Sequence, residues 1–243
     1  MDIVNQMIIV ESPTGTMLTR PFLSKGQYVY HLLKDKIVNG YLERSRIYTI
    51  IEIAESLGVS RTPVSEAVKI LGAQYYIVLY PGVGFKIREL SAEDIHENLA
   101  ISGALEKAVL EKIIRDGTTP TERMQETVDR SRQALENQAP ELYTHNSADF
   151  HRTFYALADF PKVTEILYEN VFVHEIWYRE GVCQYPELIK RLIDDHENII
   201  RIIQHQYFEQ ISEVINAHIE NCEEVLIKAV QAKGAIVDET ISG

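Results

Sequence analysis

The sequence is poor in several residue types, and each shortage excludes a class of protein. It has only two cysteines, Cys183 and Cys222, which excludes a fold built on disulfides and leads us to expect a reducing, cytoplasmic setting. Eight prolines and 12 glycines beside 45% apolar residues exclude a collagen-like or disordered chain. No apolar run approaches the ~20 residues that span a bilayer, and residues 1–15 lack the basic start of a secretory signal. We therefore expect no membrane association.

Positive charge is also scarce, and it is unevenly distributed along the chain. The 24 Lys and Arg against 36 Asp and Glu give a net charge of −12, which taken alone argues against nucleic-acid binding. Residues 25–90, however, hold nine basic and six acidic side chains, a net charge of +3. We therefore expect a basic domain over 25–90 and an acidic one over 91–235, with an extension at 1–24 and a tail at 236–243.

The basic segment has the periodicity of three helices. Residues 27–39 place apolar side chains three and four apart, which predicts an amphipathic helix that ends at Gly40. A second helix is predicted from the N-cap Thr49 through the sequence IIEIAESL. A third is predicted to run from the N-cap Thr62 to Leu71.

The spacing within the last two helices is typical of a helix-turn-helix. Ala54 is small enough for close helix approach, Gly58 tolerates positive φ in the turn, and Val64 packs back on the first helix. Two strands follow, predicted at 75–80 and 85–87 on either side of the turn sequence PGVG. Three helices and a hairpin make a winged helix-turn-helix.

This architecture predicts which residues meet DNA. The third helix would enter the major groove N-terminus first, while the wing would lie along the backbone or minor groove, where glycine amides can approach phosphates. A packing motif without DNA contacts is the alternative, but the wing and the local charge favour double-stranded DNA. The residues expected to contact DNA are Arg46, Ser60, Arg61, Thr62, Ser65, Lys69, Gly82, Gly84 and Lys86.

Beyond residue 91 helical periodicity dominates, and no strand pattern is evident. The helices are predicted at 94–115, 121–137, 140–158, 160–180, 185–205 and 208–232. Long helices with short connections predict an antiparallel bundle. The fold class is therefore mainly α, an N-terminal winged helix-turn-helix followed by an all-α antiparallel helical bundle.

Three histidines are predicted to face the interior of this bundle. His196 and His218 lie in apolar stripes, and their separation of 22 residues places them on neighbouring antiparallel helices. His151 shares a face with Phe154 and Tyr155. Periodicity leaves two interpretations open, hydrogen-bonded core residues or ligands of a first-row metal, for which imidazole is suited. No HExxH motif occurs, which excludes a metalloprotease helix.

At these motifs the chain resembles a known family. GVSRTPV at 58–64 and PGVGF at 81–85 resemble the N-terminal domain of GntR-family bacterial transcription regulators. Two later segments resemble the helical effector-binding (FCD) domain of the FadR-type branch: ADFHRTFYALADFPKV, and DHENIIRII followed by His218. The resemblance covers about residues 25–232. It implies a homodimer that binds an operator and a small-molecule effector, with one divalent transition metal, zinc or nickel, per subunit in metal-binding members.

Several positions depart from the family pattern. In metal-binding members an Asp or Asn one turn before the first histidine is the fourth ligand, and here Ser147 stands there. The three histidines can then bind a metal with water or the effector completing its shell, or the site can be empty. Ser65 replaces an Arg of the recognition helix, and a Pro-Gly pair expected near Glu43 and a Gly expected near Tyr75 are missing.

The effector is expected to be a small carboxylate that completes the metal shell. Ser102 replaces an Arg that related sequences commonly carry, so the polarity of the cavity does not carry over from the family. The residues expected to line the effector site are Ser102, Arg179 and Tyr207.

Together these patterns predict a repressor of a bacterial metabolic operon, controlled by an effector, and not an enzyme. One alternative is a regulator whose helical domain is a metal-free dimerisation scaffold, which is consistent with Ser147. The other is a metal-dependent enzyme, because open metal positions can activate water. No evident general base accompanies the histidines, and an enzyme would leave the winged domain unexplained.

Overall fold

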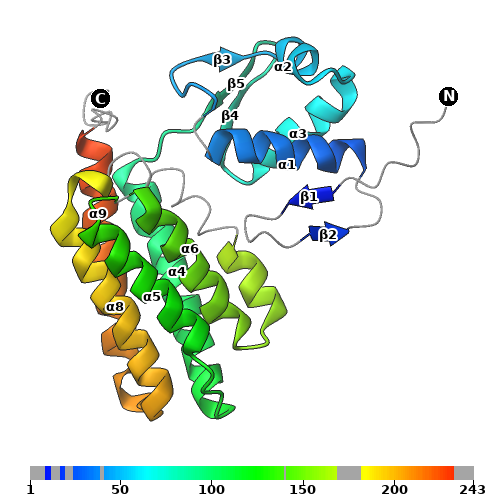
Figure 1. Ribbon diagram of the computed structural model, residues 1–243. Helices are drawn as coiled ribbons and strands as arrows, with labels where there is room; N and C mark the ends of the chain where they lie inside the picture. Colours follow the sequence, from blue (N-terminus) through cyan, green and yellow to red (C-terminus); the bar gives the residue numbers. More distant parts are fainter. Residues whose placement is uncertain are drawn as a thin grey trace. The chain divides into compact units, whose positions relative to one another are not determined.

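The structure is a computed structural model, shown in Figure 1. It describes residues 9–11, 17–19, 24–38, 41–139, 141–168 and 182–232. The chain divides into two compact units, Met1–Arg88 and Glu89–Gly243. The predicted tail at 236–243 lies outside the described residues.

The first unit combines helices with two small antiparallel sheets. Its helices are α1 (Lys25–Val38), α2 (Ile50–Leu57) and α3 (Arg61–Ala73). One sheet pairs β1 (Ile9–Glu11) with β2 (Met17–Thr19); the other has the order β3–β5–β4, from β3 (Ile47–Tyr48), β4 (Ile77–Tyr80) and β5 (Gly84–Ile87). In Figure 1, α1 packs beside α3, and Val29, Leu33 and Val64 of these helices are fully buried. This core holds α3 in place.

Local chemistry defines the second helix as the sequence predicts. The Thr49 hydroxyl accepts a hydrogen bond from the Glu52 amide at 3.1 Å, which caps α2. Gly58 ends the helix at φ +64°, a conformation in which a Cβ is strained. The predicted end of α1 at Gly40 lies outside the described residues.

The prediction that Thr62 caps the third helix is wrong. α3 begins at Arg61, and Ser60 is its N-cap with the extended angles φ −73° and ψ 163°. Pro63 therefore lies within the first turn, where amides have no intrahelical partner, so its missing N–H costs no helix hydrogen bond.

The tip of the wing is a turn that suits its Pro-Gly pair. The Val83 amide donates to the Tyr80 carbonyl at 3.0 Å, and Gly82 has φ +74° after Pro81, as a type II turn requires. The third strand of this sheet, β3, was not predicted, because a strand of two residues carries almost no alternation.

Tyr75 adopts an unusual backbone conformation just before the wing. Its φ is +62°, at the place where the family resemblance led us to expect glycine. A tyrosine there is strained, and its ring is 66% exposed with the Arg88 guanidinium 5.1 Å from the ring centre. The left-handed residue keeps the chain from extending early, so β4 begins at Ile77 and not at the predicted residue 75.

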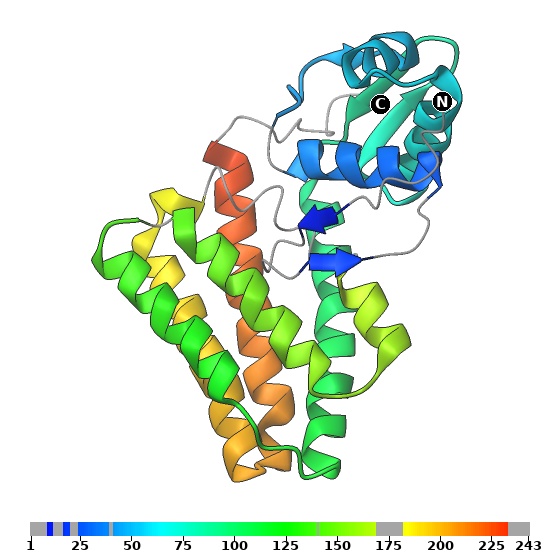
Figure 2. The ribbon, with the colours of Figure 1, turned by 45° about the vertical axis from the view of Figure 1, so that its right-hand side comes forward.

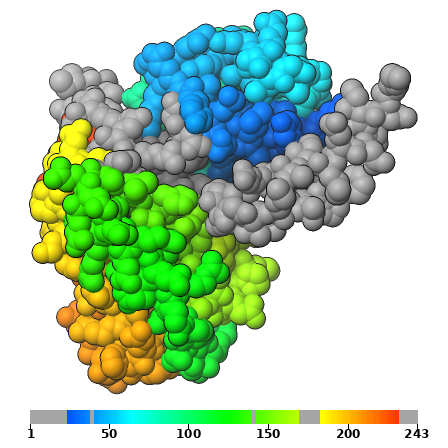
Figure 3. Space-filling view, viewed as in Figure 1, coloured from blue at the N-terminus to red at the C-terminus, as the bar shows by residue number. Residues whose placement is uncertain are grey.

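The second unit consists of helices and their connections within its described residues, which confirms the predicted mainly α fold. Its long helices are α4 (Ala92–Arg115), α5 (Glu122–Glu136), α6 (Glu141–Ala156), α8 (Pro186–His205) and α9 (Ile211–Ala232). Residues 161–168 are also helical, and the remainder of the predicted helix 160–180 lies outside the described residues. Figure 2 shows the long helices alongside one another, and in Figure 3 α5 covers the face toward the viewer with α8 beside it.

Two helix starts differ from the predicted ones for identifiable reasons. The Ser91 hydroxyl accepts the Asp94 amide at 3.0 Å and the Asp94 carboxylate accepts the Ser91 amide at 2.9 Å, a capping box. Asp94 is thus the third residue of α4 and not its first. Gln206 has φ +57°, and α9 begins only at Ile211 after a 3-10 turn.

No helix within the described part of the chain combines the length and the apolar character needed to cross a bilayer.

Gly84 approaches the neighbouring strand too closely to carry a side chain. A Cβ at Gly84 would lie 2.1 Å from the Tyr48 carbonyl oxygen, whereas a Cβ at Gly82 would meet nothing within 4 Å. We expect Gly84→Ala to lower the free energy of unfolding by about 2–4 kcal/mol, because β3 must move away from β5. Gly82→Ala should cost only about 1–2 kcal/mol, for its positive φ. Denaturant unfolding of both variants measures the difference, and equal losses would contradict this role of Gly84.

Candidate functional sites

The N-terminal end of α3 is exposed as contact with DNA requires. Arg61, Ser65 and Lys69 are four residues apart and share one face of the helix. Arg61 and Lys69 are exposed and Ser65 is half-buried, while Val64 and Leu71 on the opposite face are fully buried. The amides of a helix start attract anions such as phosphate. The exposed candidates of this helix and its cap are Ser60, Arg61, Thr62 and Lys69.

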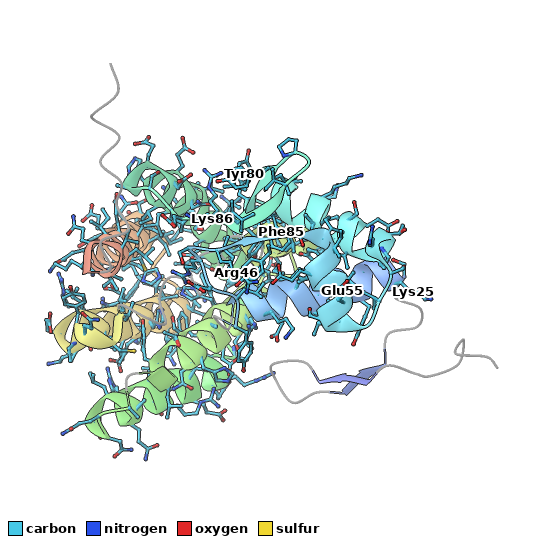
Figure 4. The ribbon with its side chains drawn as sticks, turned by 90° about the horizontal axis from the view of Figure 1, so that it is seen from above. Lys25, Arg46, Glu55, Tyr80, Phe85 and Lys86 are labelled. Carbon is cyan, nitrogen blue, oxygen red and sulfur yellow. The ribbon has the colours of Figure 1, made fainter. Side chains whose placement is uncertain are left out.

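Arg46 lies beside the wing, as Figure 4 shows. It precedes β3, where Ile47 pairs with Lys86 of β5. Its guanidinium pairs with Glu52 and lies 5.0 Å from the centre of the Tyr48 ring. The Arg46 side chain is still 53% exposed. The ion pair therefore holds Arg46 in place while one side of it faces solvent.

The two wing glycines serve different purposes. Gly82 is exposed at the tip, so its backbone can approach a phosphate. Gly84 pairs with Tyr80 within the sheet and abuts the Tyr48 carbonyl. The absence of a side chain at Gly84 is thus required inside the wing itself.

Three helices of the second unit bring the predicted histidines together. His151 comes from α6, His196 from α8 and His218 from α9. Their ring centres are 5.0 Å (His151–His196), 5.2 Å (His196–His218) and 5.4 Å (His151–His218) apart. One ring nitrogen of each lies within 4.8 Å of the other two, and the exposed fractions are 9%, 1% and 1% in chain order. We call these three residues the histidine cluster.

Burial makes positive charge costly in this cluster. Burial, together with the charges of His151 and His218, lowers the pKa of His196 well below its usual value. The His196 ring stacks on Phe150 with a centre distance of 3.9 Å, and its buried Nε2 has no hydrogen-bond partner among the described residues. The neutral form of His196 is therefore favoured, and it offers a nitrogen with no partner among the described residues.

His218 has polar neighbours on two sides. Cys222 Sγ lies 3.7 Å from His218 Nε2, and Asp195 Oδ2 lies 3.8 Å from His218 Nδ1. Asp195 also accepts a hydrogen bond from Asn221 at 2.8 Å. Burial lowers the pKa of His218, but Cys222, Asp195 and Glu106 raise it and prevail. These neighbours thus favour the protonated form of His218.

Sequence reasoning missed two polar residues beside the cluster. Glu106 of α4 is 2% exposed, and its Oε1 accepts a hydrogen bond from Tyr155 Oη at 2.5 Å. Tyr155 Oη also lies 3.2 Å from His151 Nδ1. Burial raises the pKa of Glu106, opposed by His218 and the Tyr155 hydroxyl. Two features of the sequence could have identified them: a charged residue within the apolar stripe of 94–115, and a tyrosine one turn after His151.

The residues expected to complete the metal and effector sites differ in their exposure. Ser147 is half-buried and hydrogen bonds with the Tyr143 hydroxyl. Ser102 is 3% exposed, and its Oγ has no partner in the described part of the chain. Tyr207 follows the end of α8 and is 43% exposed, away from the histidine cluster. Arg179 lies outside the described residues.

The donor set of the histidine cluster suits a divalent first-row ion. Imidazole nitrogens bind zinc at about 2.0–2.1 Å and are also good ligands for nickel, copper and iron. The unpaired Nε2 of His196 is a buried nitrogen with no other use among the described residues. Three protein nitrogens leave further coordination positions for water or an oxygen ligand.

Two protein families match separate parts of the chain. Residues 25–87 match the GntR family, described as bacterial regulatory proteins, and residues 97–221 match the FCD domain. The chain is 33% identical over 85 residues to an uncharacterized HTH-type transcriptional regulator, YdhC, of Bacillus subtilis (strain 168). The matched segment covers 35% of this chain and 38% of that protein. Over 208 residues the chain is 24% identical to the gluconate operon transcriptional repressor of the same organism, covering 79% and 85%.

Solved structures share the fold. E. coli McbR/YncC superposes with a TM-score of 0.68 at 19% identity, covering 85% of this chain and 98% of that one. A putative transcriptional regulator GntR from Rhodococcus sp. RHA1 gives the same TM-score and identity, covering 84% and 98%. At this identity the likeness concerns the fold alone. The GntR family is described as regulatory proteins and the Rhodococcus structure as a putative transcriptional regulator, neither of which is a class of enzyme.

The position of Arg61 generates a direct test of the recognition helix. If Arg61 contacts base edges or phosphates, Arg61→Ala should weaken binding to a DNA fragment selected by the wild-type protein by about 1–3 kcal/mol. Fluorescence anisotropy at fixed salt measures the affinity, and size-exclusion chromatography checks that oligomeric state is unchanged. Arg201→Ala, an exposed arginine of α8, is the control. Unchanged affinity in Arg61→Ala would contradict the assignment of α3.

Proposed function

The chain belongs to the GntR family of bacterial regulatory proteins and carries an FCD domain, and we propose that it represses a bacterial metabolic operon under the control of a small-molecule effector. DNA binding and transcription regulation follow from the family. The proposal concerns the operator contacts, the dimer, the metal, the effector and the sign of regulation. The observation that carries it is the buried histidine cluster within the FCD domain.

The operator is read by α3 and the wing. Arg61 and Lys69 project from one exposed face of α3, and Arg46, Gly82 and Lys86 supply contacts to the phosphate backbone. The net charge of +3 over residues 25–90 is modest. A single domain of that charge binds DNA weakly, so we propose a homodimer whose two winged domains read the halves of a palindromic operator.

The histidine cluster holds one divalent transition metal, zinc or nickel. His151, His196 and His218 supply the ring nitrogens, and the bound ion supplies a Lewis-acidic centre for an oxygen ligand. A small carboxylate effector can complete the shell, since carboxylate oxygen is also a metal ligand. The buried unpaired Nε2 of His196 and the tight grouping of the rings support this assignment.

The effector class and the sign of regulation draw support from one relative. The protein that is 24% identical over 208 residues is a repressor of a gluconate operon. Gluconate is a carboxylate, which agrees with an organic acid that binds at an open metal position. By this analogy we propose that the chain is a repressor released by an organic acid.

Control requires the effector to favour one arrangement of the two winged domains. A preference of about 1–3 kcal/mol changes operator affinity by roughly 5- to 150-fold, which is sufficient for regulation. Bacterial DNA lies in the cytoplasm, and we place the protein there because of its DNA-binding function.

A regulator with a metal-free helical scaffold is the second candidate. Ser147 favours it, because its hydroxyl is neutral and already hydrogen bonds with Tyr143. The two candidates differ in what the three histidines do, so metal content separates them.

Metal analysis of single variants tests the proposal. If the three histidines form one site, His151→Ala, His196→Ala and His218→Ala should each reduce bound zinc to a similar degree, by roughly ten-fold or more, because each removes one of three protein ligands. Metal content is measured by mass spectrometry after equilibration with zinc and desalting. His205→Ala, which alters an exposed histidine of α8, should retain wild-type content. Full metal content in all three cluster variants would show that these histidines are core residues and not ligands, and a wild-type protein that retains no zinc would support the metal-free scaffold.

A further inference from the structure

The histidine cluster has a buried acid beside it that the three-histidine ligand set leaves unexplained. Glu106 is 2% exposed, and of its two oxygens only Oε1 has a hydrogen-bond partner among the described residues. Burial of a carboxylate is costly unless a cation or donors compensate it. Among the described residues, Tyr155, His151 and His218 interact with Glu106 and can do so.

The hydroxyl of Tyr155 connects Glu106 to the cluster. Tyr155 Oη donates to Glu106 Oε1 at 2.5 Å and lies 3.2 Å from His151 Nδ1. The direct distance from His151 Nδ1 to Glu106 Oε1 is 3.5 Å, too long for a good hydrogen bond. The short contacts therefore run from His151 through Tyr155 to Glu106.

The direction of these hydrogen bonds determines the tautomer of His151. A tyrosine hydroxyl has one hydrogen, and here Tyr155 gives it to Glu106. It can then only accept from His151, so Nδ1 of His151 carries the hydrogen. In the neutral form of His151 the lone pair then lies on Nε2. A histidine ligand whose other nitrogen donates to a fixed acceptor is oriented and made more basic.

The charge balance of the metal site also points to Glu106. Three neutral imidazoles around a divalent ion supply no negative charge, and Ser147 adds none. Asp195, the other buried acid beside the cluster, is already paired with Asn221 and lies 3.8 Å from His218 Nδ1. Oε2 of Glu106 has no hydrogen-bond partner among the described residues. Glu106 is thus the buried carboxylate with unused capacity at this site.

We propose that Glu106 and Tyr155 are positioning residues of the metal site. Tyr155 relays a hydrogen bond from His151 Nδ1 to the Glu106 carboxylate, which presents Nε2 of His151 to the ion and supplies negative charge next to it. Glu106 acts through Tyr155 and His151 and is not itself a ligand in this arrangement. The inference rests on the metal site proposed above.

Zinc affinity of the full-length protein tests the relay. Competition against a chromogenic chelator should show a dissociation constant raised roughly 10- to 100-fold in both Glu106→Gln and Tyr155→Phe. The double variant should lose no more than the weaker-binding single variant, because both changes break one chain of hydrogen bonds. Tyr155→Phe keeps the ring and its packing, so it remains informative if Glu106→Gln folds poorly. Additive losses, or none, would overturn the relay.

Matched controls separate the relay from general damage. Glu97→Gln changes an exposed acid of α4, and Tyr168→Phe removes a hydroxyl that donates to the Arg152 carbonyl, near Tyr155 but not on His151. Both should bind zinc within two-fold of wild type. A wild-type protein that binds no zinc would defeat the metal site itself. Zinc binding that is lost in His196→Ala but unchanged in Glu106→Gln and Tyr155→Phe would defeat only the relay.

A spectroscopic measurement on the zinc-free protein reports the tautomer directly. Long-range proton–nitrogen correlation spectra of histidine-labelled protein should show His151 with its hydrogen on Nδ1. In Tyr155→Phe the signal should shift toward the Nε2 tautomer, because the fixed acceptor is gone. A merely structural role for Tyr155 would leave this signature unchanged, and an Nε2 hydrogen in the wild-type protein would overturn the proposal.

Discussion

The burial of three imidazoles at one point in a helical bundle is the constraint on which the second unit depends. Each ring carries two polar nitrogens that lose water on folding, and each must find a partner or remain a cost. Glu106, Tyr155, Asp195 and Cys222 meet part of this need, but Nε2 of His196 stays unpaired among the described residues. Four helices are tied together by this one polar centre. A bound cation would satisfy its nitrogens and its acids together.

The first unit meets a different requirement, which is to hold basic side chains on a rigid frame. The packing of α1 on α3 fixes the recognition helix, and the wing depends on Gly84 beside the Tyr48 carbonyl. Positive charge is concentrated in this part of a chain whose net charge is −12. The rest of the chain carries the excess of acidic residues. Placing the two chemistries in separate units lets each be built without compromising the other.

Much of this organisation could be predicted from the sequence, because long periodic segments and specific turn chemistry are local. Thr49, Gly58 and the Pro-Gly turn of the wing behave as their residue types require. The grouping of His151, His196 and His218 follows from apolar periodicity in three helices. What could not be predicted depends on contacts between distant residues. The hydrogen bond between Glu106 and Tyr155 joins residues 49 positions apart. The pairing of β3 with β5 is set by tertiary packing. The predicted cap of α3 was wrong because Ser60 and Thr62 are both residue types that suit an N-cap.

The central claim is that the histidine cluster is a metal centre, and anomalous diffraction from crystals of the zinc-loaded protein tests it most directly. We expect one anomalous peak per subunit at the zinc edge, about 2.0–2.1 Å from a ring nitrogen of each of His151, His196 and His218, with Nε2 as the His151 ligand. A zinc-saturated crystal with no peak among these three rings, or with zinc bound elsewhere in the chain, would contradict it.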